Sequence, residues 1–309
     1  MSGIHHVTAI SGGPERNLDF YTRVLGLRLV KKTVNFDDPG TYHLYYGDEG
    51  GTPGSILTFF PWAHAAPGRL GSGETQETAF RVPTAATGYW TQRLVEKGIP
   101  HATERRFGDT VLTFGDPDGM RFALIGVAGA ESEAAWHAGD IPAEHAIRGF
   151  HGVTLVLAQA APTGRVLTEV LGFRAAGREG ALTRYRADAA LGGFVDLREV
   201  GDFPHGKPGR GSVHHVAFRA ADDAAQAAMA QIAVKLGLHV TEQKDRNYFR
   251  SVYFREPGGV LFEIATDDPG FAVDEPRASL GQALKLPRFL EPRRTELEAK
   301  LPPLGETVT

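Results

Sequence analysis

Short apolar runs recur along the chain in a fixed order, with a single helical run between them. In the stretch 211–267, runs rich in Val, Phe and Ile open and close the segment, which is typical of β-strands. An alanine-rich run with helical composition and a further strand-like run, Ser251 to Phe254, lie between them. This order predicts a unit made of one strand, one helix and then three strands.

The helical runs share a common ending, which indicates an internal repeat. The segment Phe20-Tyr-Thr-Arg-Val-Leu-Gly26 resembles Val166-Leu-Thr-Glu-Val-Leu-Gly172, and shorter versions of this ending reach Gly98 and Gly237. Glycine is favoured just after a helix because the left-handed conformation there costs it little. We therefore expect a helix of about three turns before each of these glycines.

A second repeated mark is a tight turn before the last strand of each unit. Proline followed by Gly or Asp-Gly favours such turns, and it occurs at 52–54, 116–119 and 256–259, with a degenerate form at 190–193. The two marks predict an α+β fold of four βαβββ modules in two domains. The modules span about 3–62, 73–127, 147–200 and 211–267, with a linker at 128–146 and a surface tail at 268–309 that carries one short helix, 292–301.

Aligning the modules brings one position of each first strand and one of each closing strand into correspondence. These positions are His6, Glu77, Gly152 and His215 in the first strands, and Thr58, Ala123, Asp196 (or Leu197, one residue further) and Glu263 in the closing strands. Pairing modules one and two gives one histidine and one carboxylate, whereas pairing three and four gives one histidine and two carboxylates. Pairing one with four gives two histidines and one carboxylate, the facial triad of non-haem iron sites.

We therefore expect module one to pair with module four, and module two with module three, each pair forming a curved mixed sheet around a cavity. The predicted domains are 1–62 plus 211–267 for the metal site and 73–200 for the partner. Strand residues two apart share a face, so Thr8 faces the same way as His6. The same alternation predicts that His5 and His214 point away from the metal-binding face.

Composition narrows the function classes. The chain has 309 residues, 42% hydrophobic content and a net charge of −4 without a basic cluster, which is typical of a globular protein and argues against nucleic-acid binding. It has no cysteine, which excludes disulfides and thiolate ligands and suits a reducing cytoplasm. No apolar run approaches the roughly 20 residues of a membrane span, and Met1 leads into a strand without room for a signal peptide.

The βαβββ repeat resembles the vicinal oxygen chelate superfamily, and the whole chain resembles its ring-cleaving dioxygenases that act on hydroquinones. The matching stretches are Ile4-His-His-Val-Thr8, Tyr42-His-Leu-Tyr-Tyr46, Gly51-Thr-Pro-Gly54, Ser212 to Phe218, Asp245-Arg-Asn-Tyr-Phe249 and Ser251 to Glu263, with Glu291-Pro-Arg-Arg294 in the tail. The resemblance implies metal ligation by His6, His215 and Glu263. It also implies substrate-handling roles for Thr8, His214, Arg246, Tyr253 and His5.

The expected function is thus an Fe(II)-dependent dioxygenase that opens an aromatic diol, such as a substituted hydroquinone, with dioxygen. Mn(II) suits the same ligands. Two alternatives stay open: a glyoxalase-like isomerase, lyase or thiol transferase, and an inactive small-molecule-binding protein. Thr58 is a poor fourth ligand, which favours the open dioxygenase site over the first alternative. The formation of homo-oligomers is left open by the sequence.

Overall fold

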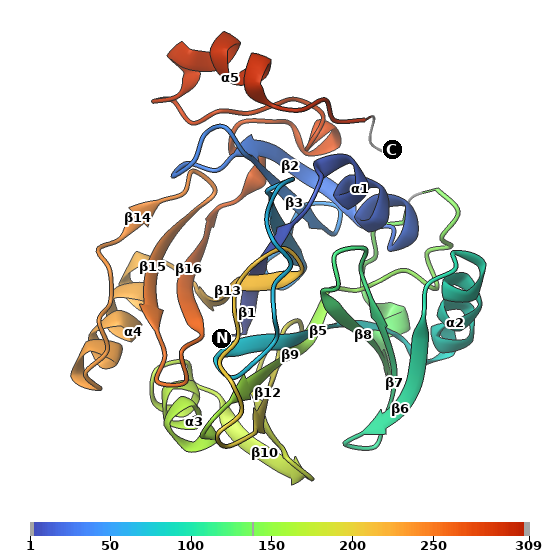
Figure 1. The fold of residues 1–309 in the computed structure, drawn as a ribbon, viewed down its shortest axis with the longest axis vertical. Helices are drawn as coiled ribbons and strands as arrows, with labels where there is room; N and C mark the ends of the chain where they lie inside the picture. The colour runs from blue at the N-terminus through green and yellow to red at the C-terminus, as the bar shows by residue number, and fades with distance from the viewer. Residues whose placement is uncertain (1–2, 138, 306–309) are drawn as a thin grey trace.

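The strands form two curved eight-stranded sheets that stand side by side (Figure 1). The computed structural model describes residues 3–137 and 139–305. Each sheet contains two of the four predicted modules, so the α+β class and the repeat of four βαβββ modules are confirmed.

The first sheet joins modules one and four. Its strand order is β14-β15-β16-β13-β1-β4-β3-β2, and β1 and β13 run antiparallel at its centre. The strands are β1 (Ile4–Ser11), β2 (Arg28–Val34), β3 (Tyr42–Gly47), β4 (Ile56–Pro61), β13 (Ser212–Ala220), β14 (Lys244–Asp245), β15 (Phe249–Arg255) and β16 (Leu261–Pro269). The predicted pairing of the first and last modules is therefore confirmed.

The second sheet joins modules two and three in the order β10-β11-β12-β9-β5-β8-β7-β6. Its strands are β5 (Glu74–Pro83), β6 (His101–Arg106), β7 (Asp109–Gly115), β8 (Arg121–Val127), β9 (Phe150–Leu157), β10 (Arg174–Glu179), β11 (Leu182–Arg186) and β12 (Phe194–Glu199). The strand order shows which modules pair, but it does not test the residue boundaries of the two predicted domains, which stay predictions.

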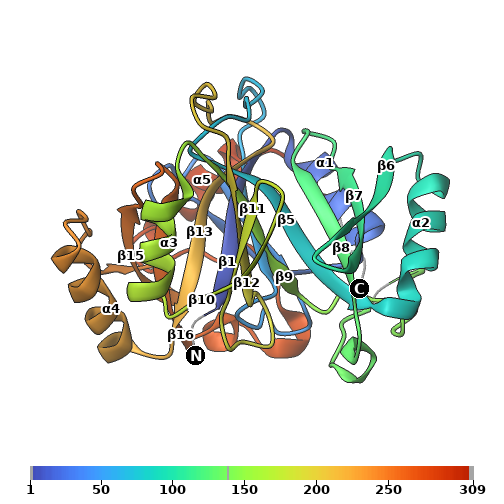
Figure 2. The ribbon, with the colours of Figure 1, turned by 90° about the horizontal axis from the view of Figure 1, so that it is seen from below.

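One helix follows the first strand of each module. These are α1 (Pro14–Asp19), continued by a π-helical turn (Phe20–Val24), α2 (Thr87–Glu96), α3 (Ala160–Glu169) and α4 (Asp223–Lys235). Single 3-10 turns occur at 84–86, 130–132, 271–273, 277–279 and 291–293. The predicted glycine endings are present, with φ of +70° at both Gly26 and Gly172. In Figure 2, α3 and α4 flank one side of the molecule and α2 the other.

Helical segments of modules one and three tie the two sheets together. The Tyr21 hydroxyl donates a 2.8 Å hydrogen bond to Asp116 of the other sheet, and its ring meets Phe122 edge-on. In the opposite direction, Thr163 of α3 donates to Glu256 in module four. Because these side chains are buried in one apolar core shared by both sheets, the two halves form a single packed body.

Strand register tests the alignment of the modules position by position. In every module, the aligned closing-strand residue pairs with the residue two places after the aligned first-strand residue. These pairs are Thr58 with Thr8, Ala123 with Ala79, Asp196 with Thr154, and Glu263 with Ala217. The eight aligned positions are therefore structurally equivalent, as the repeat predicted.

The tail lies along the β2 edge of the first sheet and ends in α5 (Arg294–Lys300), which is shorter than the predicted helix. Leu284 forms a parallel bridge with Lys32, and Tyr42 donates to the carbonyl of Pro302 over 3.1 Å. The buried Lys31 ammonium lies 2.5 Å from Asp274. No helix within residues 3–137 and 139–305 combines the length and apolar character needed to cross a membrane.

Candidate metal centre

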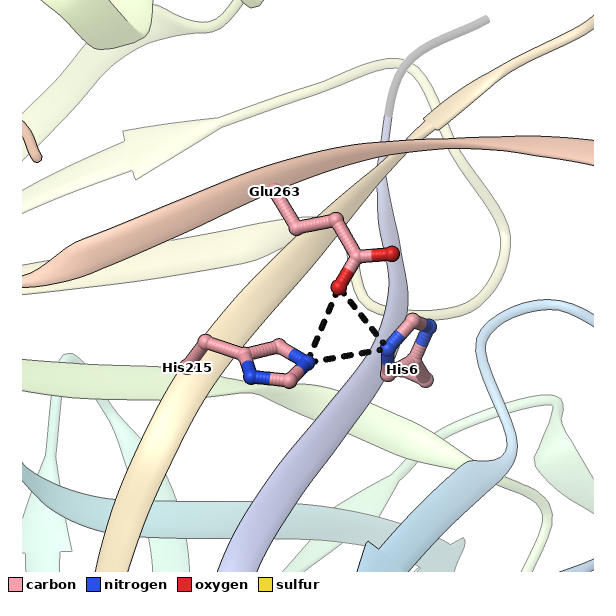
Figure 3. Close-up of side chains that lie close together, drawn as sticks. All are labelled: His6, His215 and Glu263. Carbon is pink, nitrogen blue, oxygen red and sulfur yellow. Dashed lines mark hydrogen bonds and ion pairs between the residues drawn. The ribbon is translucent and has the colours of Figure 1, made fainter. Parts of the chain in front are cut away.

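Three side chains from three neighbouring strands converge at the centre of the first sheet (Figure 3). The Nε2 atoms of His6 on β1 and His215 on β13 are 3.3 Å apart. The Glu263 Oε2 atom on β16 lies 3.3 Å from the first and 2.9 Å from the second. One ligand atom from each residue falls within 4.8 Å of the other two, so a single ion can contact all three.

The burial of these groups indicates that a cation belongs among them. His6, His215 and Glu263 are 2%, 5% and 0% exposed. Among the residues that the structure describes, none forms a well-formed hydrogen bond with Glu263 Oε2, despite the two nearby ring nitrogens. A buried carboxylate oxygen without a donor is costly. A divalent metal bound at this point satisfies the oxygen and both nitrogens at once, so the residues fit the predicted group.

The charges within the cluster shift its proton equilibria in opposite directions. Burial alone raises the pKa of Glu263, but the adjacent His6 and His215 outweigh it and hold that pKa well below the ordinary value. Burial lowers the pKa of His215, and the glutamate offsets this only in part. The cluster therefore offers an ionised carboxylate and a neutral imidazole, the forms that bind metals.

Each of the two central histidines contacts the histidine that immediately precedes it in the sequence. The Nδ1 atoms of His5 and His6 are 2.9 Å apart, and those of His214 and His215 are 2.8 Å apart. If the Nε2 atoms bind a metal, the Nδ1 atoms of His6 and His215 carry the protons and donate them to their neighbours. Such contacts fix the tautomer and orientation of metal-binding histidines.

Two β-bulges explain this arrangement and correct the predicted orientation of His214. The register between β1 and β13 shifts at His5 and again at His214, so each is an extra residue on its strand. The bulge turns His214 towards the same cavity as His215, and the prediction that it faces away is wrong. His5 does face away and lines a smaller cavity of about 240 Å³ behind the sheet.

The other carboxylate oxygen of Glu263 is held by the Ser251 hydroxyl, which donates to Oε1 from the neighbouring strand β15. This contact leaves Oε2 as the atom that faces the two histidines. Sequence reasoning missed Ser251, although a signal was available because Ser251 lies two positions before Tyr253 and so shares its face of β15.

A cavity of about 490 Å³ opens in front of the three central residues. Four of the five residues predicted to handle substrate line it: Thr8, His214, Arg246 and Tyr253. The structure places His5 outside this cavity, where its contact with His6 is its link to the centre. Phe249 stands between the two spaces and lines both.

A charged bridge crosses the mouth of the cavity. Arg246 donates from Nε to the Tyr253 hydroxyl over 3.1 Å and reaches Asp37 of module one at 3.2 Å. Asp37 is an exposed loop residue that the sequence analysis did not single out, because nothing local relates it to a residue 209 positions away. Burial and the charge of Glu263 raise the pKa of Tyr253, so this phenol stays protonated.

The equivalent positions of the second sheet are occupied by ion pairs. Arg106 binds both oxygens of Glu77 at 2.6 and 2.9 Å, and Arg184 binds both oxygens of Asp196 at 2.8 Å. Gly152 has no room for a side chain, since an added Cβ would lie 2.2 Å from the Phe194 carbonyl oxygen. Guanidinium groups thus neutralise Glu77, at the position of His6, and Asp196, at the position of Glu263.

Comparison with known proteins shows which family has this site. The chain matches the model of the Glyoxalase/Bleomycin resistance protein/Dioxygenase superfamily over residues 3–124 and 150–264. The chain belongs to this superfamily, as the sequence resemblance implied.

Relatives that match the whole chain narrow the class to the dioxygenases. MhqO of Bacillus subtilis (strain 168), assigned as a ring-cleaving dioxygenase, is 46% identical over 97% of this chain and 96% of its own. A chlorohydroquinone/hydroquinone 1,2-dioxygenase of Sphingobium indicum is 34% identical over 96% of this chain and 95% of its own. A crystal structure of a protein from Bacillus subtilis, assigned as a dioxygenase, superposes with a TM-score of 0.95 at 46% identity, covering 98% of this chain and 97% of that one. The expectation of a dioxygenase is thereby confirmed.

Proposed function

We propose that the protein is an Fe(II)-dependent ring-cleaving dioxygenase that opens a substituted hydroquinone. The observation that carries this proposal is the convergence of His6, His215 and Glu263 at the base of a 490 Å³ cavity. Two imidazoles and one carboxylate form the facial set that leaves positions open on non-haem iron. His6, His215 and Glu263 would hold the iron, which would supply electron exchange between an aromatic diol and dioxygen.

The hydrogen bonds of Thr58 favour a metal centre with open coordination positions over a glyoxalase-like centre with a fourth protein ligand. Thr58 is the equivalent of Glu263 in module one and so occupies the place of a fourth ligand. Its hydroxyl instead donates to Thr8 over 2.9 Å, so it accepts from Nε2 of His43 at 2.8 Å. A side chain engaged in this way leaves the metal with three protein ligands and room for two reactants.

The cavity wall suits an aromatic ring with oxygen substituents. Apolar contact comes from Phe36, Phe60, Trp62 and Phe249, while donors are concentrated around the centre and at the mouth. Because the Tyr253 oxygen accepts from Arg246, its own hydroxyl hydrogen can be donated to a substrate oxygen. Arg246 carries a fixed positive charge that can hold a negative ring substituent or developing charge.

His214 supplies the remaining polar group beside the centre. Burial lowers the pKa of His214 to about 4, so the ring is neutral near pH 7. When His215 binds the metal through Nε2, its Nδ1 donates to Nδ1 of His214 over 2.8 Å, which places the proton of His214 on Nε2. We propose that this N–H orients the substrate at the metal and takes part in proton transfer as the ring opens.

Oxygen consumption is the direct test. Protein is loaded with Fe(II) without air, mixed with hydroquinone, methylhydroquinone or catechol, and monitored with an oxygen electrode. We expect one equivalent of dioxygen consumed per hydroquinone and a ring-opened product containing both oxygen atoms. Faster cleavage of catechol would keep the reaction class and change the substrate. No uptake with any diol, together with isomerisation of a hemithioacetal, would contradict the proposal.

A further inference from the structure

A chain of hydrogen bonds crosses the cavity floor from module one towards the metal centre. The Tyr45 hydroxyl lies 2.8 Å from Nδ1 of His43, and Nε2 of His43 lies 2.8 Å from the Thr58 hydroxyl. Thr58 then donates to the Thr8 hydroxyl over 2.9 Å. The four side chains come from strands β3, β4 and β1, and His43 is held between the rings of Tyr45 and Phe60.

The last member of this chain is well placed to contact a ligand on the metal. Thr8 lies two positions after His6 on the same face of β1, and it pairs directly with His215 across β13. Its side chain lines the cavity, whereas Thr58 does not. Thr58 can therefore affect a bound ligand only through its neighbours, of which Thr8 is the one at the centre.

The direction of the hydrogen bonds can be deduced from their two ends. Burial lowers the pKa of His43 well below its ordinary value, so the ring is neutral and donates to one neighbour while accepting from the other. Burial raises the pKa of Tyr45 well above its ordinary value, and within residues 3–137 and 139–305 its hydroxyl has His43 as its hydrogen-bond partner. If His43 donated to Tyr45, the buried phenol hydrogen would lack an acceptor, which is costly.

The favoured order is therefore Tyr45 to His43, His43 to Thr58, and Thr58 to Thr8. In this order each hydroxyl oxygen receives a hydrogen from the preceding group and passes its own to the next. In this order the Thr8 hydroxyl hydrogen is left without an acceptor, since Thr8 accepts from Thr58 and donates to no group among the described residues. An oxygen bound at the metal can accept this hydrogen.

We propose that His43, acting through Thr58, fixes the Thr8 hydroxyl as a hydrogen-bond donor to an anionic phenol oxygen bound at the metal centre. His43 and Thr58 are thus positioning residues, and Tyr45 sets the tautomer of His43. The inference rests on the proposed function in so far as that function brings a phenol to the centre. It adds Thr58, which does not line the cavity, and His43, which does, and assigns both an effect on the charge state of the bound phenol through Thr8.

Binding of an inert phenol to Zn(II)-loaded protein tests this idea without turnover. The probe is 4-nitrophenol, whose phenolate is recognised by its visible absorption, titrated at a fixed neutral pH. We expect wild-type protein to bind the phenolate, and Thr8→Val to weaken this binding about tenfold, because it removes a hydrogen bond to a charged oxygen. Thr58→Val and His43→Phe should weaken it about threefold each, since Thr8 keeps its hydroxyl but loses its fixed direction.

The double variant Thr8→Val/Thr58→Val is decisive. If Thr58 acts through Thr8, the double variant binds the phenolate as well as Thr8→Val alone. His43→Gln, which retains an amide N–H towards Thr58, should recover part of the loss caused by His43→Phe. The matched control is Thr78→Val in the second sheet, where an equally buried hydroxyl has no hydrogen-bond partner in the described part of the chain, and it should leave binding unchanged.

The inference is overturned if Thr58→Val binds like wild type, if the two valine effects multiply in the double variant, or if wild-type protein does not bind the phenolate. Zinc content of each variant shows whether the centre itself is intact. Oxygen uptake with hydroquinone is scored separately on iron-loaded protein. If the Thr8 and Thr58 effects on phenolate binding are coupled but no oxygen is consumed, this inference is retained and the dioxygenase is rejected. If oxygen is consumed but the two effects are independent, the dioxygenase is retained and this inference is rejected.

Discussion

The ring nitrogens of His6 and His215 lie 3.3 Å apart although 209 positions separate the two residues in the chain. The contact exists because β1 and β13 pair at the centre of one sheet, so the first and last modules build the site together. Neither module supplies the site alone, since module one has Thr58 where module four has Glu263. The candidate metal centre therefore depends on the pairing of the first and last modules.

Replacing one of the two histidines should abolish tight iron binding. We expect His6→Ala to lower the affinity for Fe(II) by more than about 100-fold, because removing a ligand costs more than disturbing an outer contact. Iron content after anaerobic loading and desalting measures the effect. His151→Ala is a suitable control, since His151 is a buried histidine in the other sheet. Unchanged iron content in His6→Ala would show that these three residues do not form the centre.

The outer histidine His5 should tune metal affinity without touching the substrate. When His6 binds the metal through Nε2, its Nδ1 carries the hydrogen. The Nδ1 atom of His5 lies 2.9 Å away and accepts this hydrogen bond. His5→Phe keeps the ring and removes the acceptor, so we expect iron affinity to fall about tenfold. His5→Asn places an amide oxygen near the lost nitrogen and should restore most of the affinity. Competition with a calibrated chelator gives the values, and equal affinity in His5→Phe and wild type would contradict the role.

The sequence was sufficient to predict the repeat, the module pairing and the convergence of His6, His215 and Glu263. Helix-ending glycines and proline turns are local signals with fixed spacing, so they survive in a single sequence. The ligands could be chosen because only one pairing of modules gives two histidines and a carboxylate. The two-residue alternation along a strand gave the wrong face for His214, because a bulge adds one residue to β13 and turns this side chain to the opposite face.

Contacts between loops and between non-equivalent strand positions could not be predicted. Asp37 meets Arg246 only because the two modules pack together, and no repeat relates these residues. Ser251 and His43 lie in stretches that match the family, but their importance depends on side-chain orientations towards Glu263 and Thr58 that the sequence does not give. Such hydrogen bonds depend on tertiary geometry, which a periodic pattern does not encode.

A half-buried carboxyl at the start of β5 should make the stability pH-dependent. Burial raises the pKa of Glu74 from 4.5 to about 7, with Arg255 opposing the shift in part. Between these two values the folded protein holds a proton that the unfolded chain releases, so the free energy of unfolding falls as pH rises from 4.5 to about 7 and levels off above it. Glu74→Gln should remove this part of the slope.

Urea denaturation of wild type and Glu74→Gln at several pH values measures the difference in slope. The exposed Glu144, replaced by Gln, is the control for the loss of one negative charge. A parallel pH dependence in Glu74→Gln and wild type would show that Glu74 keeps an ordinary pKa in the folded protein.

The ion pairs of the second sheet should be more important for stability than for catalysis. Arg184 and Asp196 are 10% and 7% exposed at their side chains and form two parallel hydrogen bonds. Arg184→Met leaves the aspartate charge buried without its partner, so we expect a loss of about 3 kcal/mol in the free energy of unfolding. Removing both charges, with Arg184→Met and Asp196→Leu, should restore most of this loss, because the remaining side chains are apolar. Arg165→Met breaks an exposed pair with Glu169 and should cost less than about 1 kcal/mol.

Iron content should stay at the wild-type level in all three variants, since the two sheets hold separate sites. A loss of iron in Arg184→Met, at a temperature where this variant is folded, would show that the second sheet supports the metal centre.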